Sequence, residues 1–145
     1  MKRLTVLIHQ QHPYHQLTLH QACNAQGVFD VRLVDDLRTI PGRLQAGRAP
    51  DLLMLDQRMP SSAGTALLQR LRAERKVPAL LFTGQADSPC HDFARLAQQQ
   101  GLWVVGELHW PLSANALRMI LQRLDGITRS LPLHSRSEVV GYACR

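Results

Sequence analysis

The chain has few cysteines, few aromatic residues and no long hydrophobic run. Its three cysteines, at positions 23, 90 and 144, are odd in number and widely spaced, which argues against a disulfide framework or a cysteine-based zinc site. No apolar run approaches the roughly 20 residues that span a bilayer, and the N-terminus lacks a signal-peptide pattern. We therefore expect a cytoplasmic protein with reduced thiols and no membrane span.

Lysine is also scarce, and the positive charge comes from arginine. The formal net charge is +6. A basic balance can favour nucleic acid, but the arginines are scattered, without aromatic interleaving or a recognition-helix pattern. The composition favours a basic solvated surface and makes nucleic acid an unlikely partner, while a nucleic-acid or nucleotide-binding module stays open as an alternative.

Catalytic signatures are missing as well. The chain has no glycine-rich phosphate loop of the Walker or dinucleotide type and no catalytic-triad pattern. Ser61, Ser62 and Ser88 stand where helices are expected to begin, and we interpret them as helix caps. Fold alone does not give a function, and we expect a protein that is not an enzyme.

Five apolar segments alternate with five helix-like segments. Strands are expected at Leu4–Ile8, Val28–Val34, Asp51–Leu55, Pro78–Phe82 and Trp103–Leu108. Helices are expected at Pro13–Gly27, after Thr39 and before Pro50, at Gly64–Arg75, at Ser88–Gly101, and from Ser113 onward, where Leu117, Ile120, Leu121 and Leu124 share one face. This alternation predicts an α/β domain with a five-stranded, parallel, doubly wound sheet over residues 1–125. Residues 126–145 are expected to form a basic linker or tail, flexible or leading to an output domain.

In such sheets the functional site lies beyond the carboxyl ends of the strands. Asp56 stands at one such end, directly after a buried apolar run and before a Met-Pro breaker. Thr83 ends the next strand, and residues 9–13 and 109–111 follow two others. We therefore expect these segments to meet at one edge of the sheet.

Residues 6–13, 51–64, 81–84 and 106–111, taken in order, resemble a response-regulator receiver domain of the chemotaxis type. The match covers about residues 3–125 and implies a flavodoxin-like (βα)5 receiver fold. It also implies that Asp56 is the phospho-acceptor position and Thr83 the switch position. Residues 94–112 further resemble receivers fused to cyclic-di-GMP phosphodiesterases.

Four positions depart from the receiver pattern. Gln10 and Gln11 stand where the family has two carboxylates, Trp110 where it has a phosphate-binding lysine, and Glu107 where it has an aromatic switch residue. Mg²⁺ prefers hard anionic oxygens, and a charge pair about 4 Å apart is worth about 4 kcal/mol at an effective dielectric near 20. We therefore predict a degenerate pocket with no cofactor, in which Asp56 holds Mg²⁺ weakly at most.

Within that pocket we expect the Asp56 carboxylate to be hydrogen-bonded to Thr83 or Gln10. The Trp110 indole could cover the pocket and give Asp56 an N–H partner. The pair Asp35-Asp36 mimics the family's acidic motif, but it follows the second strand. It is expected to cap or precede the short helix and not to bind metal.

Several histidines crowd the first loop. They are His9, His12, His15 and His20, and His109 is expected at the same edge of the sheet. Imidazole is a common metal ligand, but no cysteine or carboxylate nearby in sequence completes a set. Ordinary polar histidines, or a pH-sensitive surface, are the favoured interpretation.

The sequence thus predicts a pseudo-receiver that acts as a regulatory protein-interaction module in two-component-type signalling. Its partner would be a sensor kinase, an output domain or another signalling protein, or a second copy bound through the fourth helix, fifth strand and fifth helix. Candidate contact residues on that face are Phe93, Arg95, Gln99, Trp103, Arg118 and Gln122. The main alternative is a phosphorylatable receiver that accepts phosphate on Asp56.

Overall fold

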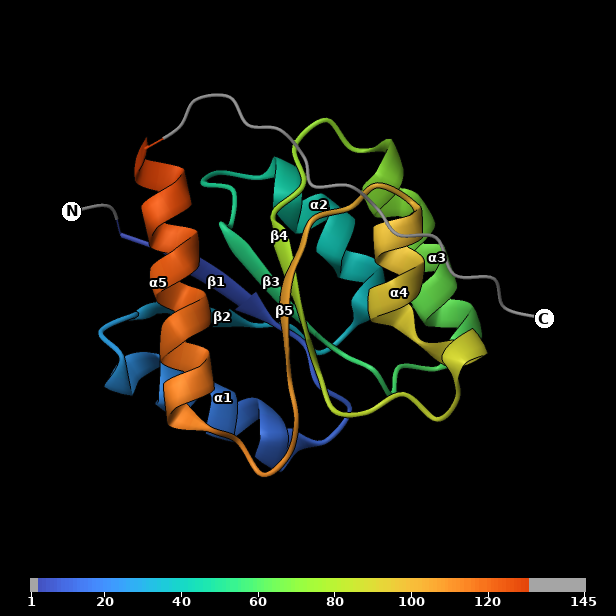
Figure 1. Cartoon of the computed structure of the whole chain (residues 1–145). Coiled ribbons are helices and arrows are strands. Elements are labelled where there is room, and N and C mark those ends of the chain that lie inside the picture. The colour runs from blue at the N-terminus through green and yellow to red at the C-terminus, as the bar shows by residue number, and fades with distance from the viewer. Residues whose placement is uncertain (1–2, 131–145) are drawn as a thin grey trace.

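The computed structural model describes residues 3–130 (Figure 1). The strands are β1 (Thr5–Ile8), β2 (Asp30–Leu33), β3 (Leu52–Asp56), β4 (Ala79–Thr83) and β5 (Val104–Leu108). The helices are α1 (Pro13–Ala25), α2 (Ile40–Gln45), α3 (Ser61–Ala73), α4 (Phe93–Gln99) and α5 (Ala114–Ser130), with 3₁₀ turns η1 (Leu37–Thr39) and η2 (Pro89–His91). The alternation predicted from the apolar pattern is confirmed.

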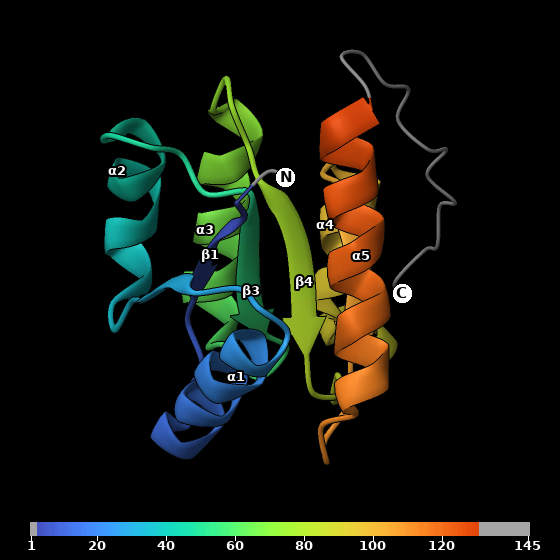
Figure 2. The ribbon, with the colours of Figure 1, turned by 90° about the vertical axis from the view of Figure 1, so that its left-hand side faces the viewer.

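The five strands form one parallel sheet in the order β2-β1-β3-β4-β5. Helices α1 and α5 cover one face, and α2, α3 and α4 cover the other (Figure 2). Every residue of β3 and β4 is buried, because these central strands have a helical layer on both sides. The predicted doubly wound fold is therefore confirmed.

Helix α1 begins and ends as the sequence predicts. Pro13 occupies its first turn, where a missing N–H costs nothing, and the His12 side chain caps the helix by accepting from the Tyr14 amide. Gly27 has a φ of +85°, and the amides of Gly27 and Val28 donate to the carbonyls of Asn24 and Cys23. This is the Schellman arrangement, in which a glycine leaves the helix in the left-handed region.

The starts of α3 and α4 differ from the prediction. Helix α3 begins at Ser61, three residues before Gly64, with Pro60 at its N-cap position and no side-chain cap hydrogen bond. The segment after Ser88 forms only the turn η2, and α4 begins at Phe93, where the Asp92 side chain accepts from the Arg95 amide at 3.2 Å. The serines are thus not the side-chain caps that we expected.

Around the short helix, Asp36 caps as expected and Thr39 does not. The Asp36 carboxylate accepts from the Arg38 amide at 2.9 Å and begins η1. Thr39 stands at the N-cap position of α2 without a cap hydrogen bond.

Helix α5 runs to Ser130, and its apolar face, with Leu117 and Leu124 fully buried, packs on the sheet. The tail was predicted to begin at residue 126, but residues 126–130 are the last turn of α5. The rest of the predicted tail, residues 131–145, lies outside the described residues. Among residues 3–130, no helix combines the length and apolar character needed to cross a membrane.

Candidate functional site

The carboxyl ends of four strands bring the predicted site residues to one edge of the sheet. Gln10 follows β1, Asp56 ends β3, Thr83 ends β4 and Trp110 follows β5. Asp56 and Thr83 are directly paired across the β3–β4 ladder. Gln10, Asp56 and Thr83 are at most 5% exposed, so this is a buried polar cluster at the carboxyl edge of the sheet.

The Asp56 carboxylate is held by two backbone amides. Its Oδ2 accepts from the Gln11 amide at 3.0 Å, and its Oδ1 accepts from the Arg58 amide at 2.9 Å. Our expectation that Asp56 would bond to Thr83 or Gln10 was wrong, because the two loops beside the carboxylate direct main-chain N–H groups at it. These bonds satisfy a buried carboxylate without a cation.

Gln10 and Thr83 bond to each other instead. The Thr83 hydroxyl donates to Gln10 Oε1 at 2.6 Å, with a longer contact of 3.4 Å to the Leu55 carbonyl. The other end of the Gln10 amide donates to the His9 carbonyl at 2.9 Å. Both ends of this buried side chain therefore have partners, and the hydroxyl proton of Thr83 is used inside the protein.

Trp110 lies beside the pocket and stacks on α1. Its ring is 3.8 Å from the His15 ring, centroid to centroid, with 13° between the planes. Trp110 is followed by a cis peptide bond to Pro111. Within residues 3–130 no hydrogen bond joins the indole N–H to Asp56, so the stack replaces the N–H contact that we anticipated.

Gly84 lies next to Asp56 and Trp110. A Cβ atom built on Gly84 would lie 3.6 Å from Asp56 Oδ1 and 4.0 Å from Trp110 Cδ1, and the residue has a φ of +86°. A side chain here would be strained by the positive φ, although its Cβ would make only ordinary van der Waals contacts with both neighbours. The backbone conformation, and not a lack of space, therefore favours glycine at this position.

The described residues do not form a metal centre. No group of three or more His, Cys, Asp or Glu side chains is placed to hold a metal ion in residues 3–130. At the edge where Mg²⁺ would bind, Gln10 is engaged with Thr83 and His9, and Gln11 is exposed. These neutral amides do not fit an Mg²⁺ site, which needs anionic oxygens beside Asp56.

Asp36, the other acidic candidate, has partners of its own. Its hydrogen bonds with the Arg38 guanidinium and amide lower the pKa of the carboxyl. Its side chain caps η1 and is partly exposed.

The histidines fall into separate environments. His9 is 5% exposed, and its Nδ1 has no hydrogen-bond partner among the described residues. Burial lowers the pKa of His9, against the opposing effects of a hydrogen bond to the Asp35 backbone and the charge of Asp56. The rings of His12 and His15 lie 5.1 Å apart, whereas His109 is exposed.

Gln57 was missed by sequence reasoning. Only 4% exposed, it donates through Nε2 to Asp92 Oδ1 at 2.8 Å and accepts from the Phe93 amide at 2.8 Å. It therefore ties the residue after Asp56 to the first turn of α4. Its position next to Asp56 was the only signal, and an exposed glutamine would have looked the same in sequence.

Phe93 was predicted to lie on a contact surface, and this was wrong. It is 5% exposed, and its ring packs so closely on Gly64 of α3 that a Cβ there would lie 2.5 Å from Phe93 Cζ. The α4 start at Phe93 turns this ring inward. Of the other candidates, Trp103 and Arg95 are half-buried, while Gln99, Arg118 and Gln122 are exposed.

The fold and the strand-end carboxylate define a receiver-type signalling domain. The family model of the response regulator receiver domain matches residues 6–104. The chain therefore belongs to the response regulator receiver domain family, whose members work in two-component signalling. No curated protein matches the chain in sequence.

Solved structures show the same fold. A response regulator from Colwellia psychrerythraea is 19% identical, with a TM-score of 0.69 over 86% of this chain and 98% of that one. A sensor protein from Polaromonas sp. JS666 is 20% identical, with a TM-score of 0.68 over 86% and 98%. The receiver domain of sensor histidine kinase PA1611 from Pseudomonas aeruginosa, solved with magnesium in its active-site cleft, is 21% identical, with a TM-score of 0.67 over 87% and 100%.

Proposed function

We propose that this protein is a degenerate receiver that regulates a partner by binding it and does not run a phosphorylation cycle. The hydrogen bond from the Thr83 hydroxyl to Gln10 Oε1, 2.6 Å long and fully buried, carries the proposal. A working switch threonine needs its hydroxyl for an incoming phosphoryl group. Here a residue at the metal-binding position holds that hydroxyl.

The electrostatics of the pocket support the proposal. Phosphoryl transfer to a carboxylate concentrates negative charge, and proteins stabilise it with metal ions and with lysine or arginine. Asp56 has two backbone amides as partners. Trp110 stands at the lysine position and stacks on His15, so it offers no positive charge to the transferring oxygens.

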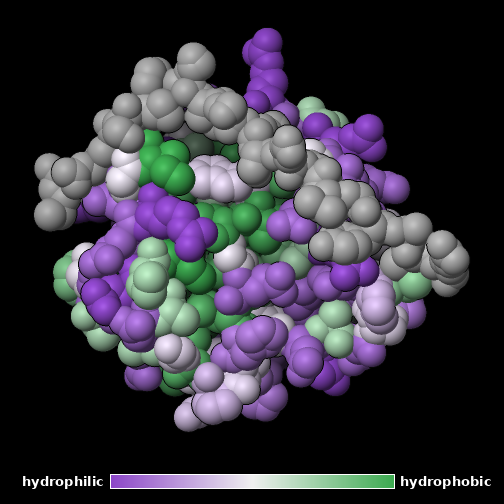
Figure 3. All heavy atoms as spheres, in the orientation of Figure 1, coloured by the Kyte–Doolittle hydropathy of each residue, from purple (hydrophilic) through white to green (hydrophobic). Residues whose placement is uncertain are grey.

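The face formed by α4, β5 and α5 is the proposed contact surface for the partner. Figure 3 shows an apolar stripe over β5, between the more polar surfaces of α4 and α5. Leu102, Trp103 and Val104 are only half-buried there. An apolar stripe with a polar rim is typical of a protein interface. We propose a signalling protein, such as a sensor kinase or an output domain, as the partner.

The link through Gln57 suggests that this face is held in one state. Gln57 and Asp92 together bind the first turn of α4 to the loop after β3. All of these groups are polar and at least partly buried, so breaking the link would leave them unsatisfied. A fixed α4 suits a module whose output does not depend on phosphate.

A phosphorylatable receiver remains the second candidate, because Asp56 and Thr83 still stand opposite each other at the strand ends. The nucleic-acid alternative has less support. Arg32, Arg38, Arg58 and Arg70 each pair with a carboxylate on the protein itself.

Acetyl phosphate labelling separates the first two candidates. The wild type is compared with a variant carrying Gln10→Asp, Gln11→Asp and Trp110→Lys together, which restores the family's acidic pair and lysine. We expect labelling of Asp56 in the triple variant only, and Asp56→Asn in that background should abolish it. Wild-type labelling at a rate close to that of the triple variant would refute the degenerate function.

A further inference from the structure

A groove of about 800 Å³ lies at the edge of the sheet opposite the Asp56 pocket. It is formed by the residues that precede β1 and β2, the end of α1 and the middle of α5. Figure 2 shows α1 and α5 on the same side of the sheet. Its apolar lining comes from Leu4, Val28 and Leu121, each of which also belongs to the core on the α1–α5 side of the sheet.

Phe29 stands on the rim of this groove, exposed. At 72% exposure it is the most exposed large hydrophobic side chain among residues 3–130. It directly precedes β2, which is an edge strand of the sheet. Burying the ring against another apolar surface is favourable. An exposed ring therefore stands next to an apolar hollow on the same surface.

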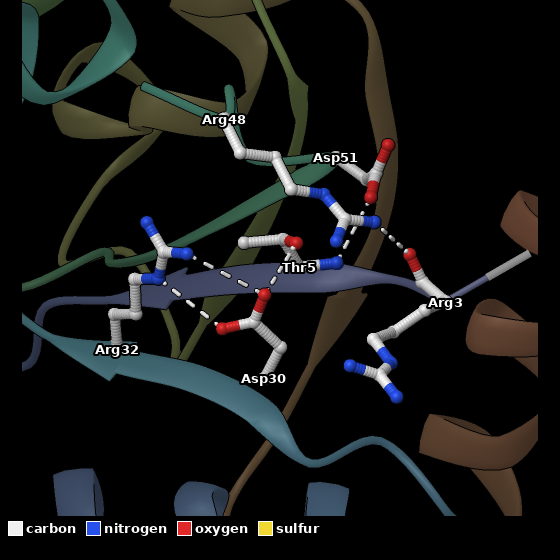
Figure 4. A network of polar contacts seen from close by, with 6 residues as sticks. All are labelled: Arg3, Thr5, Asp30, Arg32, Arg48 and Asp51. Carbon is white, nitrogen blue, oxygen red and sulfur yellow. Dashed lines mark hydrogen bonds and ion pairs between the residues drawn. The ribbon is translucent and has the colours of Figure 1, made fainter. Parts of the chain in front are cut away.

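A polar network joins the starts of the strands beside the rim (Figure 4). The Thr5 amide donates to Asp51 at 2.9 Å, and the Thr5 hydroxyl donates to Asp30 at 2.8 Å. Arg32 pairs with Asp30 at 3.2 Å. These bonds fix the starts of β1, β2 and β3 relative to one another. The backbone next to Phe29 is thus anchored at Asp30, which lowers the entropic cost of ordering this segment on binding.

The groove carries charges of both signs, from Arg3, Asp30, Arg118 and Asp125. Arg118 and Asp125 of α5 both line it, and their spacing of seven residues places them on the same helical face, about 10 Å apart along the axis. Two copies of α5 packed antiparallel about a two-fold axis near Leu121 would set each Arg118 opposite the other copy's Asp125. A symmetric dimer needs a surface that complements itself in this way.

We propose that this groove is the interface of a symmetric homodimer, in which Phe29 of each copy enters the groove of the other. Arg118 and Gln122, which we predicted to lie on the α4–β5–α5 face, both line this groove, so the two surfaces share part of α5. Helix α4 and strand β5 contribute no residue to the groove and stay available to a signalling partner. The homodimer does not depend on the proposed function, because neither Asp56 nor Thr83 lies in this interface.

Sedimentation velocity on the full chain tests the proposal, from micromolar to about 1 mM protein. The ionic strength is set near 0.15 M, where the Debye length of about 8 Å limits repulsion between two basic copies. We expect a wild-type dimer, and a monomer for Phe29→Glu with an unchanged circular dichroism spectrum. Leu17→Glu, an exposed position on α1, and Glu107→Arg on β5 should remain dimeric.

Charge reversal tests the pairing itself. Arg118→Asp and Asp125→Arg should each shift the equilibrium toward monomer, because each homodimer would oppose like charges. Mixing the two variants should restore a heterodimer, because opposite charges then meet at both ends. Failure of the folded variants to associate on mixing would contradict the antiparallel arrangement.

Three other outcomes would overturn the proposal. A wild type that stays monomeric throughout would remove the dimer. A dimer that survives Phe29→Glu and is lost in Glu107→Arg would move the interface to β5. A wild-type monomer in which Phe29→Glu shifts the amide signals of residues 131–145 would assign the groove to the chain's own C-terminal segment.

Discussion

The Thr83 hydroxyl reaches Gln10 Oε1 over a distance of 2.6 Å and so connects the ends of β4 and β1, two strands that are separated in the sheet by β3. The bond links residues 73 apart in sequence and passes beside the end of the strand that carries Asp56. Gln10 therefore does more than remove a negative charge from the pocket. Its side-chain amide also accepts a hydrogen bond that links the end of β4 to the loop after β1.

Thr83→Val should destabilise the protein although it preserves the shape of the side chain. It leaves the buried Gln10 oxygen without a donor, and such a group costs about 1–3 kcal/mol. Urea unfolding measures the loss. Thr65→Val, on the half-buried side of α3, is the matched control and should stay within about 0.5 kcal/mol of the wild type. Equal losses in the two variants would mean that the hydrogen bond to Gln10 contributes nothing.

The His15–Trp110 stack should appear as a coupling energy. Single and double alanine variants at His15 and Trp110 form a double-mutant cycle, with unfolding free energies as the measurement. A stacked pair of rings gives about 0.5–1.5 kcal/mol beyond the area that each ring buries. If the losses of unfolding free energy in the two single variants add up to the loss in the double variant, the coupling energy is zero. The stacked rings would then not stabilise the contact between the β5–α5 loop and α1.

His9 should make stability depend on pH. Burial lowers its pKa in the folded protein below the ordinary value of about 6.5, so the unfolded chain binds more protons as the pH falls through that value. The contribution of neutral His9 to the free energy of unfolding is therefore fully present above about pH 6.5, and it is lost as the pH falls toward the folded-state pKa. The unfolding free energy of the wild type minus that of His9→Leu, followed from pH 8 to 5, should decrease at the acidic end. A value that stays constant or increases as the pH falls would contradict the predicted sign.

Gly64→Ala should destabilise the contact between α3 and α4, because the new methyl group meets the buried Phe93 ring at 2.5 Å. Overpacking of this kind costs about 1–3 kcal/mol. Gly42→Ala in α2 is the control, since nothing lies within 4 Å of its Cβ position. The control should be neutral or stabilising by up to about 1 kcal/mol. Phe93→Leu should relieve part of the Gly64→Ala loss, and an absence of relief would place the strain elsewhere.

The strands and the edge where Asp56 and Thr83 meet were predictable from the sequence. Apolar runs that end in a single polar residue have few alternatives in a parallel sheet, and the polar residues that follow them gather at its carboxyl edge. The partners of Asp56 were not predictable. They are main-chain amides of Gln11 and Arg58, and their direction depends on the conformation of two loops, which side-chain chemistry does not encode.

The start of α4 was mispredicted for a related reason. Ser88-Pro89 is a good local helix start, but the long-range bonds from Gln57 to Asp92 and Phe93 place the first turn later. That shift turns the Phe93 ring into the core. A contact made with a residue 36 positions away leaves no mark on the local pattern.

The most direct test of the degenerate pocket is an amide NMR titration of the wild type, first with Mg²⁺ and then with Mg²⁺ plus beryllofluoride, which mimics a phosphorylated carboxylate. The degenerate account predicts that the amides of Gln11, Arg58 and Gly84, which surround Asp56, do not shift at millimolar Mg²⁺ or after beryllofluoride is added. The variant with Gln10→Asp, Gln11→Asp and Trp110→Lys should show shifts at the same positions. Saturating shifts in the wild type, centred on Asp56 and Thr83, would show that the pocket still binds metal and a phosphoryl group and would contradict the account.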